Sequence, residues 1–206
     1  MSSEIIYYTI FAGVNGAGKT SLYSAIKDGG ELGKRVNIDE LVAEQGSWRD
    51  TLLQIKAGRS AMELINLYID KKISFHQETT LPGVTIIKQI KKAKAAGFTV
   101  RLYFVGLDSV ETAIERVHRR VEKGGHGIED DVIRRRFEKI PETLAAMLPL
   151  CDSAVFFDNT KKFRTIAIFK DNKIIDIDAD VPEWFSELLS LCGHFEKEST
   201  TEQQSE

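Results

Sequence analysis

The stretch GVNGAGKT, residues 13–20, has the residue types needed to hold phosphate groups and fits the pattern G-x-x-x-x-G-K-[ST]. Glycines let the backbone turn its N–H groups around an anion, and the N-terminus of a following helix adds a partial positive charge. In this pattern Lys19 reaches the β and γ phosphates and the Thr20 hydroxyl ligates Mg²⁺. We therefore predict a nucleoside triphosphate site. Its predicted contacts are Gly13, Asn15, Gly16, Ala17, Gly18, Lys19, Thr20 and Ser21.

Binding a triphosphate does not define what is done with it. The sequence lacks the N-K-x-D motif by which switch GTPases read guanine, and AVFFDN (154–159) only faintly resembles the Asp-Glu strand of ATP-driven motors. A small-molecule kinase instead needs a carboxylate near the phosphate, an acceptor pocket and mobile arginines that close over the transferring group. The sequence offers candidates for all three.

Asp39 is the candidate carboxylate. It ends the predicted strand RVNID (35–39), and in a parallel sheet the ends of strands share the edge where ligands bind. It is positioned to act as the general base that deprotonates an acceptor hydroxyl. The alternative is that Asp39 caps the helix that follows, for which Asp is also favoured.

The segment FHQETTLPG supplies the acceptor candidates. Glu78 and Thr80 end the third predicted strand and point the same way, as alternate residues of an extended chain do. They suit recognition of hydroxyl or amide groups. The alternative is a helix start, with Thr79 or Thr80 capping a helix that begins near Pro82. His76 fits a packed histidine better than a catalyst.

Arginines gather on two predicted helices that flank EKGGHGIED, a glycine-bearing connection suited to a lid at about residues 122–130. The apolar stripes of these helices leave Arg120 and Arg136 beside the buried face, while Arg119 and Arg135 point away. Helix phase near a hinge leaves Arg134 open as an alternative to Arg136. A salt-bridged surface helix pair is the alternative for the whole cluster. His126 is suited either to a ligand contact on closure or to fixing the turn.

The elements that position these residues alternate between strand and helix patterns. This alternation predicts a three-layer, mostly parallel α/β P-loop fold in a single domain over residues 1–195, with a C-terminal β-hairpin and helix at about 163–193. Residues 196–206 are polar and predicted to be disordered. The predicted strands are 5–12, 35–39, 73–78, 98–105 and 153–158, and the predicted helices are 19–27, 60–71, 84–96, 109–121 and 130–148.

Composition excludes several other classes. A net charge of -3 gives no basic field for nucleic acid, so we expect no nucleic-acid partner. Cys151 and Cys192 are far apart and suggest neither a disulfide framework nor a zinc site. The sequence shows no apolar run long enough to span a membrane and no N-terminal signal pattern, so a cytoplasmic protein without a membrane partner is expected.

Taken together, these residues resemble the zeta toxin family of P-loop kinases, particularly its smaller chromosomal members. The resemblance rests on GVNGAGKT, NID, ETTLPG, RVHRRVEKGGHGI and VIRRRF, and covers roughly residues 5–160. It implies an ATP-dependent kinase related to enzymes that phosphorylate the amino-sugar hydroxyl of UDP-N-acetylglucosamine. The implied roles are phosphate binding for Lys19, the catalytic base for Asp39, sugar-nucleotide contacts for Glu78 and Thr80, and ATP phosphate contacts for Arg120 and Arg136.

The sequence departs from the plasmid toxins in its shorter length and in its C-terminal hairpin and helix, so a different small metabolite is an alternative acceptor. A toxic role would also need a neutralising protein partner, which the sequence does not identify. A nucleotide-dependent switch protein is the competing hypothesis from another class. Phosphorylation of a polynucleotide end is disfavoured by the acidic charge balance.

Overall fold

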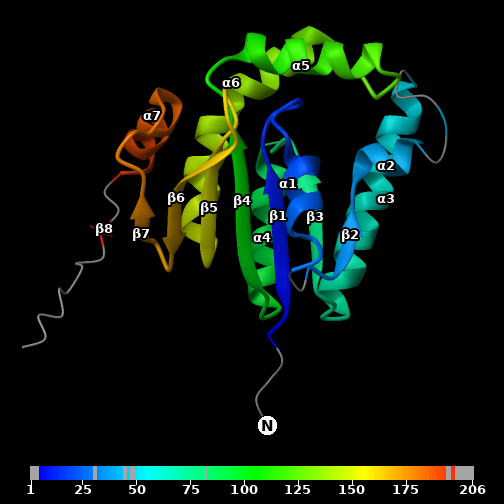
Figure 1. Ribbon diagram of the computed structural model, residues 1–206. Helices are drawn as coiled ribbons and strands as arrows, with labels where there is room; N and C mark the ends of the chain where they lie inside the picture. The colour runs from blue at the N-terminus through cyan, green and yellow to red at the C-terminus, as the bar shows by residue number, and fades with distance from the viewer. Residues whose placement is uncertain are drawn as a thin grey trace, which may run out of the picture.

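The fold is built on one sheet of eight strands with the order β2-β3-β1-β4-β5-β6-β7-β8 (Figure 1). The computed structural model describes residues 5–29, 32–43, 46, 50–81, 83–193 and 196–197. Its strands are β1 (Tyr7–Ala12), β2 (Lys34–Val36), β3 (Phe75–Thr79), β4 (Thr99–Gly106), β5 (Ser153–Asp158), β6 (Arg164–Lys170), β7 (Lys173–Ile177) and β8 (Glu196–Lys197). The first five strands are parallel, which confirms the predicted P-loop α/β architecture.

The parallel pairing brings the functional segments to one edge. Ala12, the last residue of β1, pairs with Thr79 of β3 and with Phe104 of β4. β1 is almost entirely buried because helices cover both faces of the sheet, and this explains why Thr9 is its only residue without an aromatic or aliphatic side chain. The glycine-rich turn after β1 and the polar segment after β3 therefore emerge side by side.

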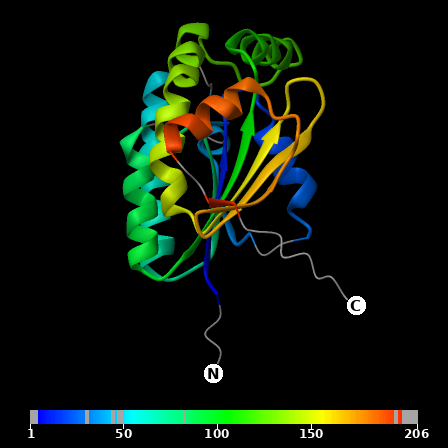
Figure 2. The same ribbon diagram turned by 90° about the vertical axis from the view of Figure 1, so that its left-hand side faces the viewer.

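Helices complete three layers. Figure 2 shows α1 on one face of the sheet and α3, α4 and α6 on the other, while α5 crosses above the strand ends in Figure 1. The helices are α1 (Lys19–Ile26), α2 (Ile38–Ala43), α3 (Thr51–Asp70), α4 (Val84–Ala95), α5 (Val110–Glu122), α6 (Asp130–Met147) and α7 (Glu183–Cys192). No helix within the described residues is long and apolar enough to cross a membrane.

Two elements differ from the sequence prediction. The strand expected over 35–39 ends at Val36, and the chain enters α2 at Ile38, so Asp39 is a helical residue rather than a strand end. β2 is an edge strand with one partner, and the bond from the Leu41 N–H to the Asn37 carbonyl starts the helical turn. α3 begins at Thr51, earlier than predicted, because Asp50 caps it by accepting from two backbone N–H groups.

The C-terminal segment forms the predicted hairpin and helix. β6 and β7 are joined by Asp171 and Asn172, both with positive φ (49° and 61°), as a two-residue hairpin turn requires. α7 packs on α6 at this end of the sheet. The disorder predicted from residue 196 is wrong for Glu196 and Lys197, which pair with β7 as β8, while residues 198–206 lie outside the described residues.

His76 is a packed core histidine, as expected. Its ring stacks on Tyr23 with centroids 4.9 Å apart, and its Nδ1 lies 3.0 Å from the Leu32 carbonyl oxygen. The Nε2 atom is buried without a hydrogen-bond partner, so protonation would bury an unpaired donor. Burial accordingly lowers the pKa of His76 below its ordinary value, against a weaker opposing effect of the hydrogen bond to Leu32.

This lowered pKa predicts a loss of stability on acidification. Between the folded and unfolded pKa values the unfolded chain binds more protons, so the free energy of unfolding falls as the pH drops through about 6.5 towards the folded value. We expect His76→Phe, which keeps the aromatic stack, to show a smaller drop in Tm than the wild type between about pH 7.5 and 5.5. Thermal unfolding followed by circular dichroism measures this difference. His118→Gln, an exposed control, should keep the wild-type drop, and an equal drop in His76→Phe would contradict the prediction.

Candidate active site

The glycine-rich turn adopts a conformation that only glycine enters easily. Gly16 and Gly18 have φ values of 80° and 107°, and each is crowded by a neighbouring element. A Cβ on Gly16 would lie 2.7 Å from the Ala113 carbonyl oxygen of α5, and one on Gly18 would lie 2.6 Å from the Asn159 amide nitrogen. The turn therefore depends on glycine both for its backbone angles and for its close contacts.

Lys19 begins α1 directly after this turn. Its Nζ donates to the carbonyl oxygens of Gly13 and Val14 at 3.0 and 3.1 Å, so its ammonium group is folded back over the loop. The N-terminus of α1, with its partial positive charge, faces the same space. Lysine, loop and helix N-terminus thus form one positively polarised cradle for phosphate.

Glu78 joins three elements at this cradle. Its carboxylate accepts from the Thr20 hydroxyl at 2.8 Å, from the Arg35 guanidinium at 2.7 Å and from the Asn37 amide at 3.3 Å. The side chain is only 7% exposed, and the ion pair with Arg35 offsets the cost of burying its charge. The sequence predicts that Glu78 contacts the acceptor. The structure places its carboxylate beside the Thr20 hydroxyl of the phosphate loop.

The Thr20 hydroxyl and the Glu78 carboxylate have the chemistry to hold Mg²⁺. Both are hard oxygen donors, and the 2.8 Å between them lets one ion contact both. The described residues contain no group of three or more acidic, His or Cys side chains that could hold a metal. In proteins Mg²⁺ commonly takes only one or two protein ligands and completes its coordination with phosphates and water.

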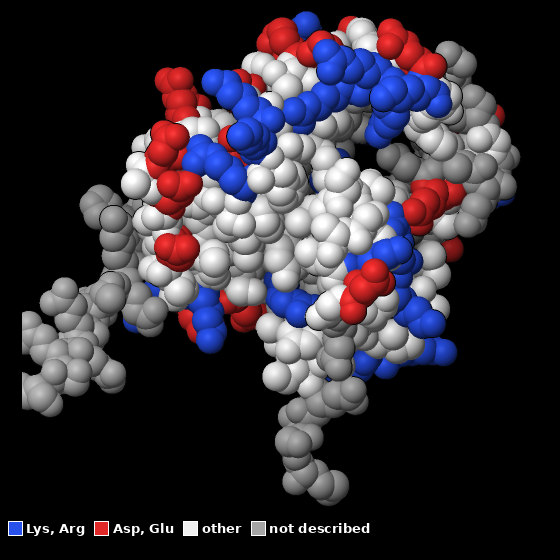
Figure 3. Space-filling model, viewed as in Figure 1, with Lys and Arg blue, Asp and Glu red and all other residues white. Residues whose placement is uncertain are grey.

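Three arginines line the cavity above the phosphate loop. Arg136 of α6 donates to the Asn15 side-chain oxygen at 2.9 Å, and Arg120 of α5 donates its Nε to the His126 carbonyl at 2.6 Å. Arg116, also on α5, donates to the carbonyls of Asn159 and Thr160 at 2.7 and 3.0 Å. Figure 3 shows basic side chains along α5 above a hollow in this face.

The other arginines of the cluster lie on the surface. Arg119 pairs with Glu115 at 2.6 Å and Arg134 pairs with Glu111 at 2.7 Å, and Arg135 is exposed. Of the two arginines that the sequence left open, Arg136 lines the cavity and Arg134 does not, while a phosphate contact of Arg136 stays a prediction. The backbone of His126, rather than its ring, fixes the turn by accepting from Arg120.

Two residues of the site escaped the sequence analysis. Arg116 precedes Arg120 by four positions and so shares its helix face, a spacing that could have identified it. Asn159 follows β5 and donates its amide to the Ala17 carbonyl at 2.7 Å, which ties this loop to the phosphate loop. No local motif marks Asn159, because the contact spans the sheet from β5 to the turn after β1.

The phosphate-site cavity has a volume of about 490 Å³. Its described lining residues are Asn15, Gly16, Gly18, Lys19, Thr20, Ser21, Asn37, Ile38, Glu78, Thr79, Thr80, Arg116, Arg120 and Arg136. A cavity of about 200 Å³ under the 122–130 connection shares Asn15, Ile38, Arg120 and Arg136 with it. Another of about 200 Å³, between α3, β3 and α4, shares Ile38, Glu78 and Thr79. Ile38 lines all three spaces.

The structure says less about Asp39 and Thr80 than about the other predicted site residues. Asp39 lies in α2, and its side chain falls outside the described residues, so its role stays a prediction. Thr80 lines the phosphate-site cavity. Neither threonine caps α4, which begins at Val84 after Gly83 without a side-chain cap, and the Thr79 hydroxyl instead accepts from the Leu81 N–H.

Solved structures share this fold. The complex titled AvrRxo1-ORF1:AvrRxo1-ORF2 with sulphate ions matches with a TM-score of 0.67 and 15% identity, over 90% of this chain and 64% of that chain. The same complex solved with ATP matches with a TM-score of 0.61 and 14% identity, over 85% and 61%. A structure from the PezAT chromosomal toxin–antitoxin system of Streptococcus pneumoniae matches with a TM-score of 0.54 and 18% identity, over 79% and 71%. The chain thus spans somewhat under two thirds of the AvrRxo1-ORF1:AvrRxo1-ORF2 chain it matches.

Fold and phosphate loop together define a protein of the P-loop α/β class. The family model described as "Zeta toxin" matches residues 7–178, so the chain belongs to the zeta toxin family, as its motifs indicated. A protein of Haemophilus influenzae, described as uncharacterized, is 34% identical over 137 residues, which are 66% of this chain and 94% of that protein.

The inward and outward arginines should differ in phosphate binding. We expect Arg136→Gln to weaken binding of inorganic tripolyphosphate about tenfold, because a charge-assisted hydrogen bond to phosphate is lost. Arg135→Gln, one position away but exposed, should change the dissociation constant less than about twofold. Isothermal titration calorimetry of both variants tests this. Equal weakening by the two substitutions would mean that only the net charge of the helix matters.

Proposed function

We propose that the protein is an ATP-dependent kinase that transfers the γ-phosphate to a hydroxyl group of a small metabolite, with a sugar nucleotide such as UDP-N-acetylglucosamine as its acceptor. One observation carries the proposal: a single cavity is lined by the phosphate loop, by Glu78 and by three arginines from the two helices of the lid. Phosphoryl transfer needs positioning and charge stabilisation above all, and this arrangement supplies both.

The phosphate end supports ATP as donor. Lys19 and the loop N–H groups would hold the β and γ phosphates, and Arg120 and Arg136 would neutralise charge on the transferring group. Arg120 is held by a backbone carbonyl in this structure, so rotation can exchange that neutral partner for a phosphate oxygen. The absence of a guanine-reading motif in the sequence favours adenine over guanine.

Mg²⁺ would be held by the Thr20 hydroxyl and by Glu78. When bound, the ion would supply positive charge that offsets the negative charge of the phosphate groups. Arg35 and Asn37 keep the Glu78 carboxylate facing Thr20, so the two oxygen donors are oriented before the ion arrives.

Asp39 is the proposed general base. Its chain neighbours Asn37 and Ile38 both line the phosphate-site cavity, which supports a position near the transferring phosphate. A carboxylate there would accept the proton of the attacking hydroxyl as the new P–O bond forms and the bond to the β-phosphate oxygen breaks.

Part of the acceptor would enter the adjoining cavity between α3, β3 and α4, and the rest would extend into the phosphate-site cavity, with which it shares Ile38, Glu78 and Thr79. The walls of the adjoining cavity combine apolar side chains, such as Val36 and Ile65, with the buried amides of Gln77 and Gln89, which lie 3.5 Å apart. Amides pair with amide and imide groups, and UDP-N-acetylglucosamine carries both. This chemistry supports a sugar nucleotide, and Thr80 is available to its hydroxyl groups.

An antitoxin-like protein partner belongs to the same proposal. The PezAT structure comes from a system titled as toxin–antitoxin, and this chain shares its fold and its family. If the kinase acts on a metabolite that the host requires, a protein that covers the arginine-lined cavity would silence it.

The central test follows the γ-phosphate. Purified protein with Mg-ATP and UDP-N-acetylglucosamine should yield a sugar nucleotide heavier by one phosphate in mass spectrometry. Asp39→Asn should lower the transfer rate by about 10²–10⁴-fold while ATP affinity changes little, because a general base acts only in the chemical step. Asp28→Asn, an exposed control, should keep full activity. ATP binding without a phosphorylated product would reject this acceptor, and loss of transfer together with loss of ATP binding in Asp39→Asn would reject the assigned role.

The metal assignment is tested with two glutamates that share one arginine. Glu78 and Glu40 both pair with Arg35 at 2.7 Å, but Glu78 is buried beside Thr20 whereas Glu40 is exposed. We expect Glu78→Gln to raise the Mg²⁺ concentration for half-maximal activity about tenfold, because a charged oxygen ligand is lost. Glu40→Gln should leave it within about twofold. A shift in Glu40→Gln as large as that in Glu78→Gln would show that the ion pair, and not metal binding, is responsible.

A further inference from the structure

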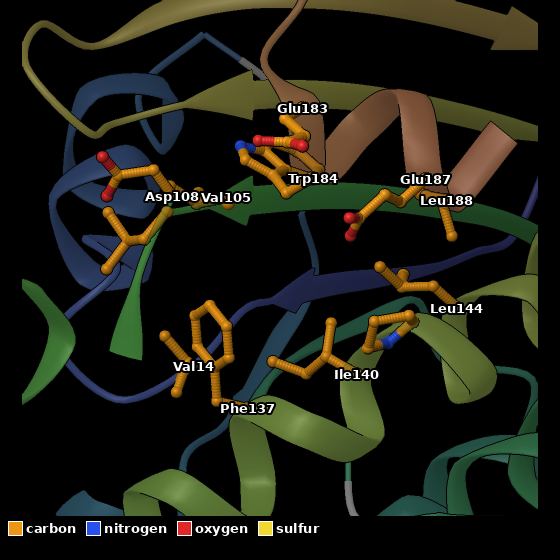
Figure 4. A pocket seen from close by; sticks show the side chains of 13 residues that line it. Val14, Val105, Asp108, Phe137, Ile140, Leu144, Glu183, Trp184, Glu187 and Leu188 are labelled. Atoms are coloured by element: carbon orange, nitrogen blue, oxygen red, sulfur yellow. The ribbon is translucent and has the colours of Figure 1, made fainter. Parts of the chain in front are cut away.

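A separate cavity of about 190 Å³ lies between α6 and α7, behind the phosphate loop. Among the described residues, none lines both this cavity and the phosphate-site cavity. Figure 4 shows Trp184 and Leu188 of α7 facing Phe137, Ile140 and Leu144 of α6 across an open space. The walls are apolar, which is the environment of a ligand site rather than of a solvent channel.

The rim of this cavity is uniformly acidic. Asp108, Glu183 and Glu187 line it and are exposed, and no Lys, Arg or His is found among the described lining residues. Figure 4 shows these carboxylates on the α7 side and at the end near β4. Three like charges around an apolar space favour an occupant that is cationic at one end.

One backbone group at the cavity wall lacks its usual partner. Pro141 has no N–H to donate to the Phe137 carbonyl four residues earlier in α6, so this carbonyl is left as an acceptor. Both residues line the cavity. A carbonyl acceptor of this kind suits an ammonium group.

We propose that the cavity binds a small organic cation with an apolar body, an arylalkyl amine in chemical class. The apolar body would lie between Phe137 and Trp184, whose indole face also attracts cations. The ammonium group would face the acidic rim. The cavity is smaller than the roughly 300–1,000 Å³ of drug-sized sites, which limits the body to about one ring.

The position makes this an effector site. Val14 and Phe137 line the cavity, and their chain neighbours Asn15 and Arg136 are bonded to each other at the phosphate site. The Val14 carbonyl also accepts from Lys19. An occupant that fixes Val14 and Phe137 in these positions should therefore favour phosphate binding on the other side of the loop.

The test uses three probes of nearly equal shape: 2-amino-1-phenylethanol as the cation, 1-phenylethane-1,2-diol as the neutral analogue and mandelate as the anion. The sequence has two tryptophans, so Trp48→Phe leaves the indole N–H resonance of Trp184 as an unambiguous reporter in a ¹H–¹⁵N spectrum. We expect saturable shifts with the cation, at least about tenfold weaker binding of the diol and no saturable binding of mandelate. Equal affinities for all three probes would show that the cavity binds apolar groups without regard to charge and would contradict the proposal. The absence of any shift with the cation would also overturn it.

Charge-neutral variants give the matched control. Glu183→Gln and Glu187→Gln should each weaken the cation about two- to fivefold, whereas Asp176→Asn, an exposed residue of β7, should not. Equal effects of all three would show non-specific attraction and would overturn the site. Saturating cation should also tighten tripolyphosphate binding about two- to threefold. Cation binding that leaves the affinity for tripolyphosphate unchanged would reject the effector role. Neither the cation measurement nor the tripolyphosphate measurement depends on which acceptor the kinase uses.

Discussion

The buried carboxylate of Glu78 is the constraint on which the site depends. A charge removed from water must be paired, and the three donors that satisfy it come from the phosphate loop, from β2 and from the turn before α2. Each donor fixes its own segment relative to the end of β3. The single need to compensate one carboxylate therefore holds together Thr20 and the chain that leads into Asp39, although these segments are far apart in sequence.

The same constraint reaches into the core. Arg35, which pairs with Glu78, lies with its guanidinium carbon 3.8 Å from the Tyr23 ring centroid, and Tyr23 stacks on His76. The charge of Arg35 pairs with Glu78, while the flat face of its guanidinium group packs on the Tyr23 ring. The ammonium group of lysine is not planar and could not make both contacts equally well. His76 must stay neutral to pack there, because its Nε2 has no acceptor. The stability of the core and the geometry of the site are coupled through these three side chains.

The sequence was most informative where local pattern and tertiary role agree. The phosphate loop, the parallel strands and the hairpin turn at Asp171 each follow from glycine placement, strand burial or turn chemistry within a few residues. The sequence could favour Arg136 over Arg135 as the inward-facing arginine, because a residue's position around the helix decides whether its side chain lies near the buried face. The contacts of Asn159 and Glu78 could not be predicted, because each joins residues 41 or more positions apart. The predicted strand extended beyond Val36, where β2 ends. β2 is an edge strand with one partner, so its end is set by few contacts, and none of them is visible in the local sequence.

The partners of the arginines separate functional from structural roles more clearly than their positions do. Arg119 and Arg134 are paired with carboxylates at the surface, where a phosphate would have to displace a like charge. Arg116 and Arg120 line the cavity and donate to neutral backbone carbonyls. A carbonyl orients a guanidinium without neutralising it, so the full charge stays available to an anion. Arg116 and Arg120 are thus oriented by neutral carbonyl oxygens, and an incoming phosphate could pair with their charge.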